Sequence, residues 1–212
     1  HSGRFVAPAA DILLDNFHLV SAEIAGIRRD LPRTYARGLP RLAPPEHGGR
    51  ARIYEIAVEL IRHTDSHLVE QQLVQFLDAY QRVAPLTLGE LWAWPSMLKL
   101  ALIENLRRLS DELCLARSAR LAADAYIDAA SLRPMSSRPR ATDPAFVVQL
   151  LHRVREYGGH LTELRIAVDQ DLAGRDTSAE ETIRVEHRHQ GVAQASMTSA
   201  VSSLRLCTTL NW

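Results

Sequence analysis

Residues 87–130, TLGELWAWPSMLKLALIENLRRLSDELCLARSARLAADAYIDAA, decide the fold class of this chain. The stretch opens with Thr87-Leu88-Gly89-Glu90, a capping box in which the Thr hydroxyl and the Glu carboxylate bond two amides at a helix start. Apolar residues then recur at helical spacing to about Ala130, which predicts a long helix. Pro95 lies inside it and predicts either a kink or a short first turn before a fresh start at Ser96.

Helical periodicity also dominates the rest of the chain. A second long helix is predicted from the capping box Thr177-Ser178-Ala179-Glu180 toward Leu210. Prolines and glycines predict exposed loops near residues 32–50 and 131–143. No segment shows sustained two-residue alternation between turn signals. The sequence therefore predicts an all-α helical bundle of about seven or eight helices, two of them long.

The composition predicts one domain with its own core. The chain has 212 residues, of which 46% are hydrophobic and 24% charged, and we expect a single all-α domain over residues 11–212. Residues 1–10 lack the order of a signal peptide and are predicted to be a junction left by an expression vector or a disordered leader. The longest uncharged run, residues 191–204, is too short and too polar to cross a bilayer. Cys114 and Cys207 lie in apolar helical patterns and are predicted to be reduced core thiols.

The charge balance argues against a nucleic-acid partner. Lys plus Arg equals Asp plus Glu at 25 each, and Lys99 is the only lysine. A nucleic-acid-binding domain usually carries a basic surplus. The guanidinium group suits fixed pairs with carboxylates, so the arginines are interpreted as partners within a packed helical scaffold.

Three short clusters resemble metal or catalytic motifs without supporting one. His63-Thr64-Asp65-Ser66-His67 lies at a junction between helices, where Asp65 or Ser66 is more simply a helix cap. His187 and His189 in Glu186-His187-Arg188-His189 are two apart and leave a helix on different sides. Asp169-Gln170-Asp171 lies in a helical pattern rather than after a strand. We predict no metal site and no catalytic residue in this chain.

Polar residues inside apolar stripes are the better candidates. A buried charge or amide needs a partner, so these residues predict either a polar network that fixes helix register, which we favour, or a ligand site. Glu104 and Arg108 are four apart, which favours an ion pair on one helix face. The candidate binding residues are Asp15, Asn16, His18, Glu90, Trp92, Glu104, Asn105 and Arg108.

The same stretches resemble the N-terminal region of the cyclic β-1,2-glucan synthases. The resemblance covers nearly the whole chain in order, although none of its blocks is a catalytic motif. Its blocks are Leu14-Asp15-Asn16-Phe17-His18-Leu19-Val20, residues 27–33, Tyr80-Gln81-Arg82-Val83, residues 86–92, Ile103-Glu104-Asn105-Leu106-Arg107-Arg108-Leu109, residues 144–151, residues 202–206 and Leu210-Asn211-Trp212.

The resemblance implies a segment of a large enzyme that polymerises glucose from UDP-glucose with a divalent metal. It implies a position at the cytoplasmic face of the bacterial inner membrane, with other domains of the same polypeptide as partners. No catalytic motif of the family occurs here, so we expect no cofactor in this segment and a non-catalytic scaffold or regulatory role. One alternative is a helical glucan-binding or sugar-processing domain, in which Trp92, Trp94 and Tyr80 stack on glucose rings while Glu90 and Glu104 bind hydroxyls. Another is an oligomerisation module that uses the last helix.

Overall fold

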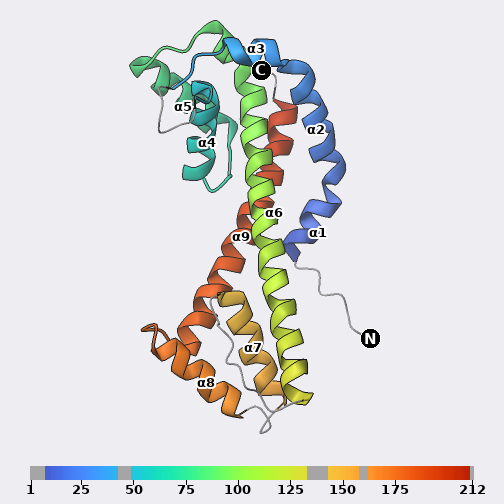
Figure 1. Ribbon diagram of the computed structural model, residues 1–212. Helices are drawn as coiled ribbons and strands as arrows, with labels where there is room; N and C mark the ends of the chain where they lie inside the picture. The colour runs from blue at the N-terminus through green and yellow to red at the C-terminus, as the bar shows by residue number, and fades with distance from the viewer. Residues whose placement is uncertain (1–7, 43–48, 133–142, 158–161, 211–212) are drawn as a thin grey trace. The chain divides into compact units, whose positions relative to one another are not determined.

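The computed structural model describes residues 8–42, 49–132, 143–157 and 162–210, which contain nine helices (Figure 1). Within these ranges there is no strand, and the only β-type pairing is one isolated bridge between Arg41 and Ala51. The all-α prediction is confirmed, and α6 and α9 are its two long helices. The helices are α1 (Pro8–Asp15), α2 (Phe17–Asp30), α3 (Arg33–Gly38), α4 (Arg52–His63), α5 (Glu70–Val83), α6 (Leu88–Leu132), α7 (Pro144–Tyr157), α8 (Thr162–Ala173) and α9 (Ala179–Thr209).

The chain divides into two compact units. Unit 1 comprises His1–Leu109 and Ala193–Trp212, and unit 2 comprises Ser110–Val192. The first part of α6 and the last part of α9 belong to unit 1, and the remainder of each helix belongs to unit 2. The single domain over residues 11–212 stays a prediction.

Side-chain caps fix the starts of three helices. At α6, the Glu90 amide donates to the Thr87 hydroxyl while the Thr87 amide donates to the Glu90 carboxylate, as the capping box predicts. At α7, the Ala145 amide donates to the Asp143 carboxylate at 2.8 Å. At α9, the cap is Ser178, whose hydroxyl accepts from the Glu181 amide at 3.2 Å. This cap lies one residue later than the predicted box at Thr177. Helix α6 continues through Pro95 without a fresh start at Ser96.

Two segments near the N-terminus differ from the prediction. Apolar residues at steps of three and four between Ile12 and Leu31 predict one helix, but the structure divides this segment at Asn16. The Asn16 side-chain amide donates to the Ile12 carbonyl at 2.7 Å and so competes with the backbone ladder. The loop predicted over residues 32–50 contains α3, which begins after Pro32 in extended conformation. Residues 43–48 of that loop and 133–142 of the loop near 131–143 lie outside the described residues, as do residues 1–7 of the predicted leader.

The turn between α4 and α5 also differs from the prediction. Asp65 and Ser66 do not cap α5, which begins at Glu70 after Val69. Both residues instead adopt the left-handed backbone region, with φ of 48° and 65°. They form a turn in which the Ser66 amide donates to the Ile61 carbonyl at 2.9 Å.

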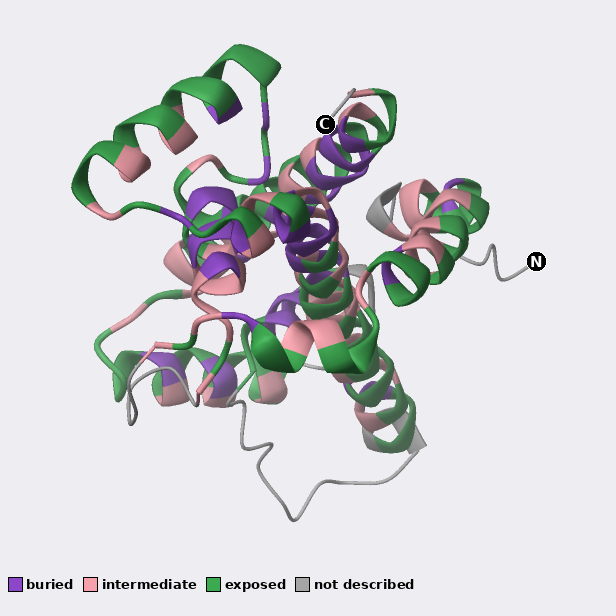
Figure 2. Ribbon diagram, turned by 90° about the horizontal axis from the view of Figure 1, so that it is seen from above, coloured by how far each residue is buried: buried purple, intermediate pink, exposed green. Residues whose placement is uncertain are grey.

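The core of unit 1 is built from α4, the first part of α6 and the last part of α9. Figure 2 colours the chain by burial, with buried residues purple and exposed residues green. Trp94 is 2% exposed and stacks on Phe76 of α5 with ring centroids 6.4 Å apart. Cys207 lies in this core, whereas Cys114 is exposed, so only one of the two predicted core thiols is buried. Burial raises the pKa of the Cys207 thiol to about 12.

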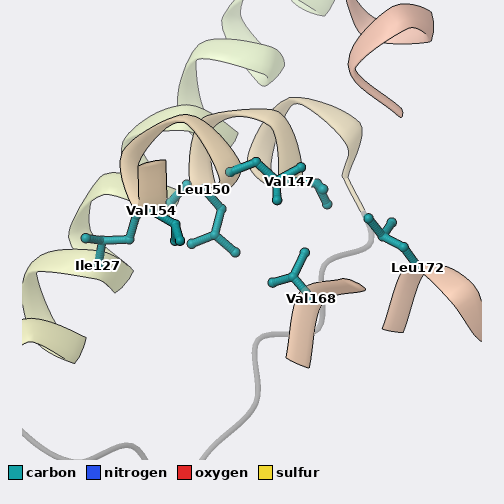
Figure 3. Close-up of a cluster of buried hydrophobic side chains, with 8 residues drawn as sticks. Ile127, Val147, Leu150, Val154, Val168 and Leu172 are labelled. Atoms are coloured by element: carbon teal, nitrogen blue, oxygen red, sulfur yellow. The ribbon is translucent and has the colours of Figure 1, made fainter. Parts of the chain in front are cut away.

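Unit 2 has its own apolar cluster, which α6, α7 and α8 share (Figure 3). Tyr126 of α6 meets Phe146 of α7 edge to face, with ring centroids 6.2 Å apart. The buried members of the cluster are Ala123, Ile127, Val147, Leu150, Leu151, Val154, Val168 and Leu172. Within the described ranges, none of the helices has the length and apolar content needed to cross a bilayer.

Candidate functional site

Glu90 lies at the start of α6, where its carboxylate accepts four hydrogen bonds inside unit 1. Arg52, the first residue of α4, donates from Nε to Oε1 at 2.8 Å and from Nη2 to Oε2 at 2.6 Å. Thr87 donates to Oε2 from its amide and from its hydroxyl, each at 2.9 Å. The Glu90 side chain is fully buried. The capping box therefore also forms a bidentate ion pair that ties α4 to α6.

The charge of Glu90 depends on these partners. Burial raises the pKa of its carboxyl group, but the hydrogen bonds from Arg52 and Thr87 outweigh burial, and the pKa lies below its ordinary value of 4.5. In acid, the unfolded chain therefore binds a proton at this position before the folded chain does. The resulting stabilisation is complete above the unfolded pKa and is lost as the pH falls through the folded pKa.

We expect the free energy of unfolding to decrease as the pH falls below about 4.5, and Glu90→Gln to remove part of that decrease. Denaturant unfolding followed by circular dichroism at a series of pH values measures it. Glu104→Gln is the control, because hydrogen bonding from Arg107 also lowers the pKa of Glu104 but this pair is exposed. A Glu90→Gln variant with the same pH dependence as the unmodified chain would contradict the expectation.

Trp92 and Trp94 do not line a common surface. Trp92 is 73% exposed, whereas Trp94, two residues further along the helix, is buried. The arrangement leaves one indole ring available to solvent, while Glu90, two residues earlier on α6, is buried and has both carboxylate oxygens bonded.

Asn105 belongs to a polar network that joins the turn after α4 to α6 and α9. Its amide donates to the Ser66 hydroxyl at 2.7 Å. The Ser203 hydroxyl of α9 donates to the Ser66 carbonyl at 2.6 Å and accepts from the Leu68 amide at 2.9 Å. Ser66 and Ser203 are 1% and 2% exposed. The network supplies partners for buried backbone groups of the turn and so fixes its position.

Ser203→Ala is expected to lower the free energy of unfolding by about 1–3 kcal/mol, because it leaves the buried Ser66 carbonyl and Leu68 amide without the hydroxyl they share. Ser202→Ala is the matched control, since Ser202 is the exposed neighbour on the same helix. Chemical denaturation of the two variants measures the difference. Equal stabilities would show that this hydroxyl contributes little.

Glu104 and Arg108 each have a partner three residues away. Arg107 donates from Nη2 to the Glu104 carboxylate at 2.8 Å, and Arg108 donates from Nη2 to the side-chain Oδ1 of Asn105 at 2.9 Å. Glu104, Arg107 and Arg108 are all exposed. These are i,i+3 contacts along α6, and the predicted i,i+4 pairing of Glu104 with Arg108 stays a prediction.

Asn16 is the buried member of the N-terminal candidates. Its side-chain oxygen, Oδ1, accepts a hydrogen bond from Arg205 of α9. Asp15 and His18 on either side are exposed. These three residues lie at the junction of α1 and α2, and the contact with Arg205 ties that junction to α9.

Some partners in these contacts were not candidates from the sequence. Arg52 is 38 positions from Glu90, and Ser203 is 137 positions from Ser66, so no local spacing signals either contact. Ser203 lies in a run of small residues that predicts only close helix packing. Lys99 of α6 also pairs with Glu23 of α2 at 2.9 Å, with side chains that are 19% and 15% exposed.

The clusters set aside as metal sites have structural partners. His63 is exposed, and its Nε2 lies 3.4 Å from Glu59 on the same helix. Glu186 is buried in unit 2, where it accepts from Arg120 at 3.3 Å and from Gln190 at 2.7 Å. Across the ranges that the structure describes, no three His, Cys, Asp or Glu side chains are grouped as a metal ion would require.

Sequence comparison aligns the whole chain with one segment of a much longer protein. The two are 33% identical over 223 aligned positions. That protein is the cyclic β-(1,2)-glucan synthase NdvB of Rhizobium meliloti (strain 1021). The resemblance predicted from the sequence is thus confirmed. No family model matches the chain.

The chain spans about 8% of the length of NdvB. Because the alignment covers all of this chain, it includes both compact units and every candidate residue in them. The similarity to NdvB therefore concerns the helical scaffold as a whole and not one isolated motif.

Proposed function

We propose that this chain is a non-catalytic scaffold domain of a cyclic β-1,2-glucan synthase, an enzyme that polymerises glucose from UDP-glucose. The observation that carries the proposal is the use of the buried and half-buried polar candidates as ties between helices. Glu90 bonds Arg52, Asn105 bonds Ser66, and Asn16 bonds Arg205. The similarity to NdvB over the whole chain supports a synthase as the parent protein.

The carboxylates of the candidate set also fit a scaffold better than a hydrolase. Residues 90 and 104 are separated by fourteen helical rises of 1.5 Å, or about 21 Å along α6. Glycoside hydrolysis needs two carboxyl groups about 5–10 Å apart, one of which has a raised pKa. The pKa values of Glu90 and Glu104 are both lowered. This pair therefore supplies neither the spacing nor the general acid.

Under this proposal the chemistry belongs to the rest of the polypeptide. UDP-glucose and a divalent metal bind outside this segment, and the partners of the segment are other domains of the same chain. The segment lies on the cytoplasmic face of the bacterial inner membrane. Its contribution is a rigid helical surface on which those domains assemble.

The test uses the full-length synthase with substitutions in this segment. Glu104→Gln and His18→Ala change exposed candidates and are expected to leave the turnover of UDP-glucose within about twofold of the unmodified enzyme, since neither side chain holds the fold. The purified 212-residue chain is expected to release no UDP from UDP-glucose. A loss of about a hundredfold or more in turnover, with unchanged amounts of folded enzyme, would assign catalysis to this segment and overturn the proposal.

A glucan-binding role is the second candidate, and the 73% exposure of Trp92 favours it. An exposed indole can stack on the apolar face of a glucose ring, although the buried Glu90 carboxylate, bonded by Arg52 and Thr87, is not available to sugar hydroxyls. Calorimetry with linear β-1,2-glucan tests this role, with Trp92→Ala as the variant. Absence of heat at millimolar glucan counts against binding, and heat that Trp92→Ala abolishes supports it.

A further inference from the structure

The net charge of zero conceals a strongly basic segment. Residues 28–52 contain seven arginines and only two acidic residues, Asp30 and Glu46. Arg28 in the last turn of α2 and Arg33 and Arg37 on α3 are all exposed. Among the described residues, no acidic side chain pairs with any of these three guanidinium groups. Such unpaired cations on a neutral protein favour an anionic partner.

Arg33 is poorly placed for the stability of its own helix, whereas Arg37 lies in the last turn, where a cation is favourable. Arg33 is the first residue of α3, and the first turn has no acidic residue. A cation at a helix N-terminus is unfavourable because the backbone dipole is positive there. Arg37 follows four residues later and therefore lies on the same face as Arg33. Helix stability therefore does not account for Arg33.

Exposed apolar side chains lie around the start of α6, which α3 contacts through Tyr35. Tyr35, between Arg33 and Arg37, donates from its hydroxyl to the Gly89 carbonyl at 2.6 Å and so holds α3 against the start of α6 (Figure 1). Leu88, the neighbour of Gly89, is 65% exposed. Trp92 follows Leu88 by four residues on the same face. Val83, at the end of α5, is 88% exposed.

We propose that this basic–apolar surface, made of Arg28, Arg33, Arg37, Val83, Leu88 and Trp92, binds the anionic headgroups of a phospholipid bilayer. Guanidinium groups pair with lipid phosphates, and an indole ring prefers the level of the headgroups. Exposed Leu and Val side chains gain from entering the acyl boundary, which a single-stranded nucleic acid does not offer. The surface rests on the proposed function in one respect, since a membrane synthase would bring it close to a bilayer.

Co-sedimentation of the 212-residue chain with vesicles tests the surface. At about 0.1 M salt, the chain is expected to bind vesicles of phosphatidylcholine with one quarter phosphatidylglycerol and not to bind vesicles of pure phosphatidylcholine. High salt is expected to release the bound chain. The double variant Arg33→Ala and Arg37→Ala is expected to bind about thirtyfold more weakly. Trp92→Ala is expected to lose about tenfold.

Matched variants separate this surface from charge or apolarity in general. Arg165→Ala with Arg184→Ala removes the same charge from exposed arginines of unit 2 that have acidic neighbours on their own helices. Leu115→Ala removes another exposed apolar side chain. Both are expected to bind within about twofold of the unmodified chain, and circular dichroism checks that all variants keep their helix content.

Three results would overturn the proposal. They are equal binding to neutral and anionic vesicles, equal weakening by the unit 2 variants, and displacement of the chain from vesicles by single-stranded RNA at equal salt. The measurement involves no UDP-glucose, so a failure here leaves the scaffold role intact. Conversely, turnover that depends on Glu104 would end the scaffold proposal without touching the lipid contact.

Discussion

Arg52→Ala is expected to lower the free energy of unfolding by about 3 kcal/mol. The substitution leaves the fully buried Glu90 carboxylate with only the two Thr87 bonds and removes the link between α4 and α6. Loss of one partner from a buried ion pair costs about 3–5 kcal/mol. We expect the lower end, because the Arg52 side chain is 23% exposed and water can reach the vacated position. Urea denaturation followed by far-ultraviolet circular dichroism measures it.

Two further variants identify the cause of that loss. Arg62→Ala breaks an exposed pair with Glu59 on the same helix and is expected to cost less than about 0.5 kcal/mol. The double variant Arg52→Ala with Glu90→Gln is expected to lose less than the sum of the two single variants, because the unpaired charge is then absent. Strict additivity would show that the two side chains act independently.

Leu150→Ala is expected to lower the free energy of unfolding of unit 2 by about 2–5 kcal/mol. Leu150 is 0% exposed and lies among Ile127, Val147 and Val154 in the cluster shared by α6, α7 and α8 (Figure 3). Truncation removes the transfer free energy of the side chain and leaves a cavity that α7 fills only in part. Hydrogen exchange of the α7 amides measures the effect within this unit.

Leu121→Ala is the matched control, since the same truncation takes place at a position on α6 that is 59% exposed. A change within about 0.5 kcal/mol is expected there. If the two variants exchange at similar rates, the cluster does not stabilise unit 2 in the way its burial indicates.

Local chemistry made the helical architecture predictable. The Thr87–Glu90 box acts through backbone groups within three residues, so its sequence signal does not depend on distant packing. The division at Asn16 was not predictable, because the side-chain oxygen of Asn16, Oδ1, accepts a hydrogen bond from Arg205 near the other end of the chain. The helix over Arg33–Gly38 was not predicted, because the surrounding prolines and glycines are typical of a loop. Tyr35 holds this helix to Gly89, which is 54 positions away in the sequence.

The candidate residues were also only partly predictable, because their partners lie far away in the sequence. Polar residues in apolar stripes correctly signalled partners for the buried Asn16 and Glu90 and for the half-buried Asn105, since a polar group removed from water needs one. The pattern could not say which partners, because Arg52, Ser66 and Ser203 come from other helices and turns. The pattern also did not distinguish the buried and half-buried candidates from the exposed candidates Asp15, His18 and Glu104. Burial, which depends on the packing of distant segments, makes that distinction.

The ion pair between Lys99 and Glu23 gives the chain a built-in reporter. An amine-reactive reagent meets one side-chain target in all 212 residues. That ammonium group is held 2.9 Å from Glu23 and is only 19% exposed, so acylation is expected to be faster when α2 moves away from α6 at this point. The acylation rate of the Lys99 side chain therefore reports the openings of α2 without an introduced label.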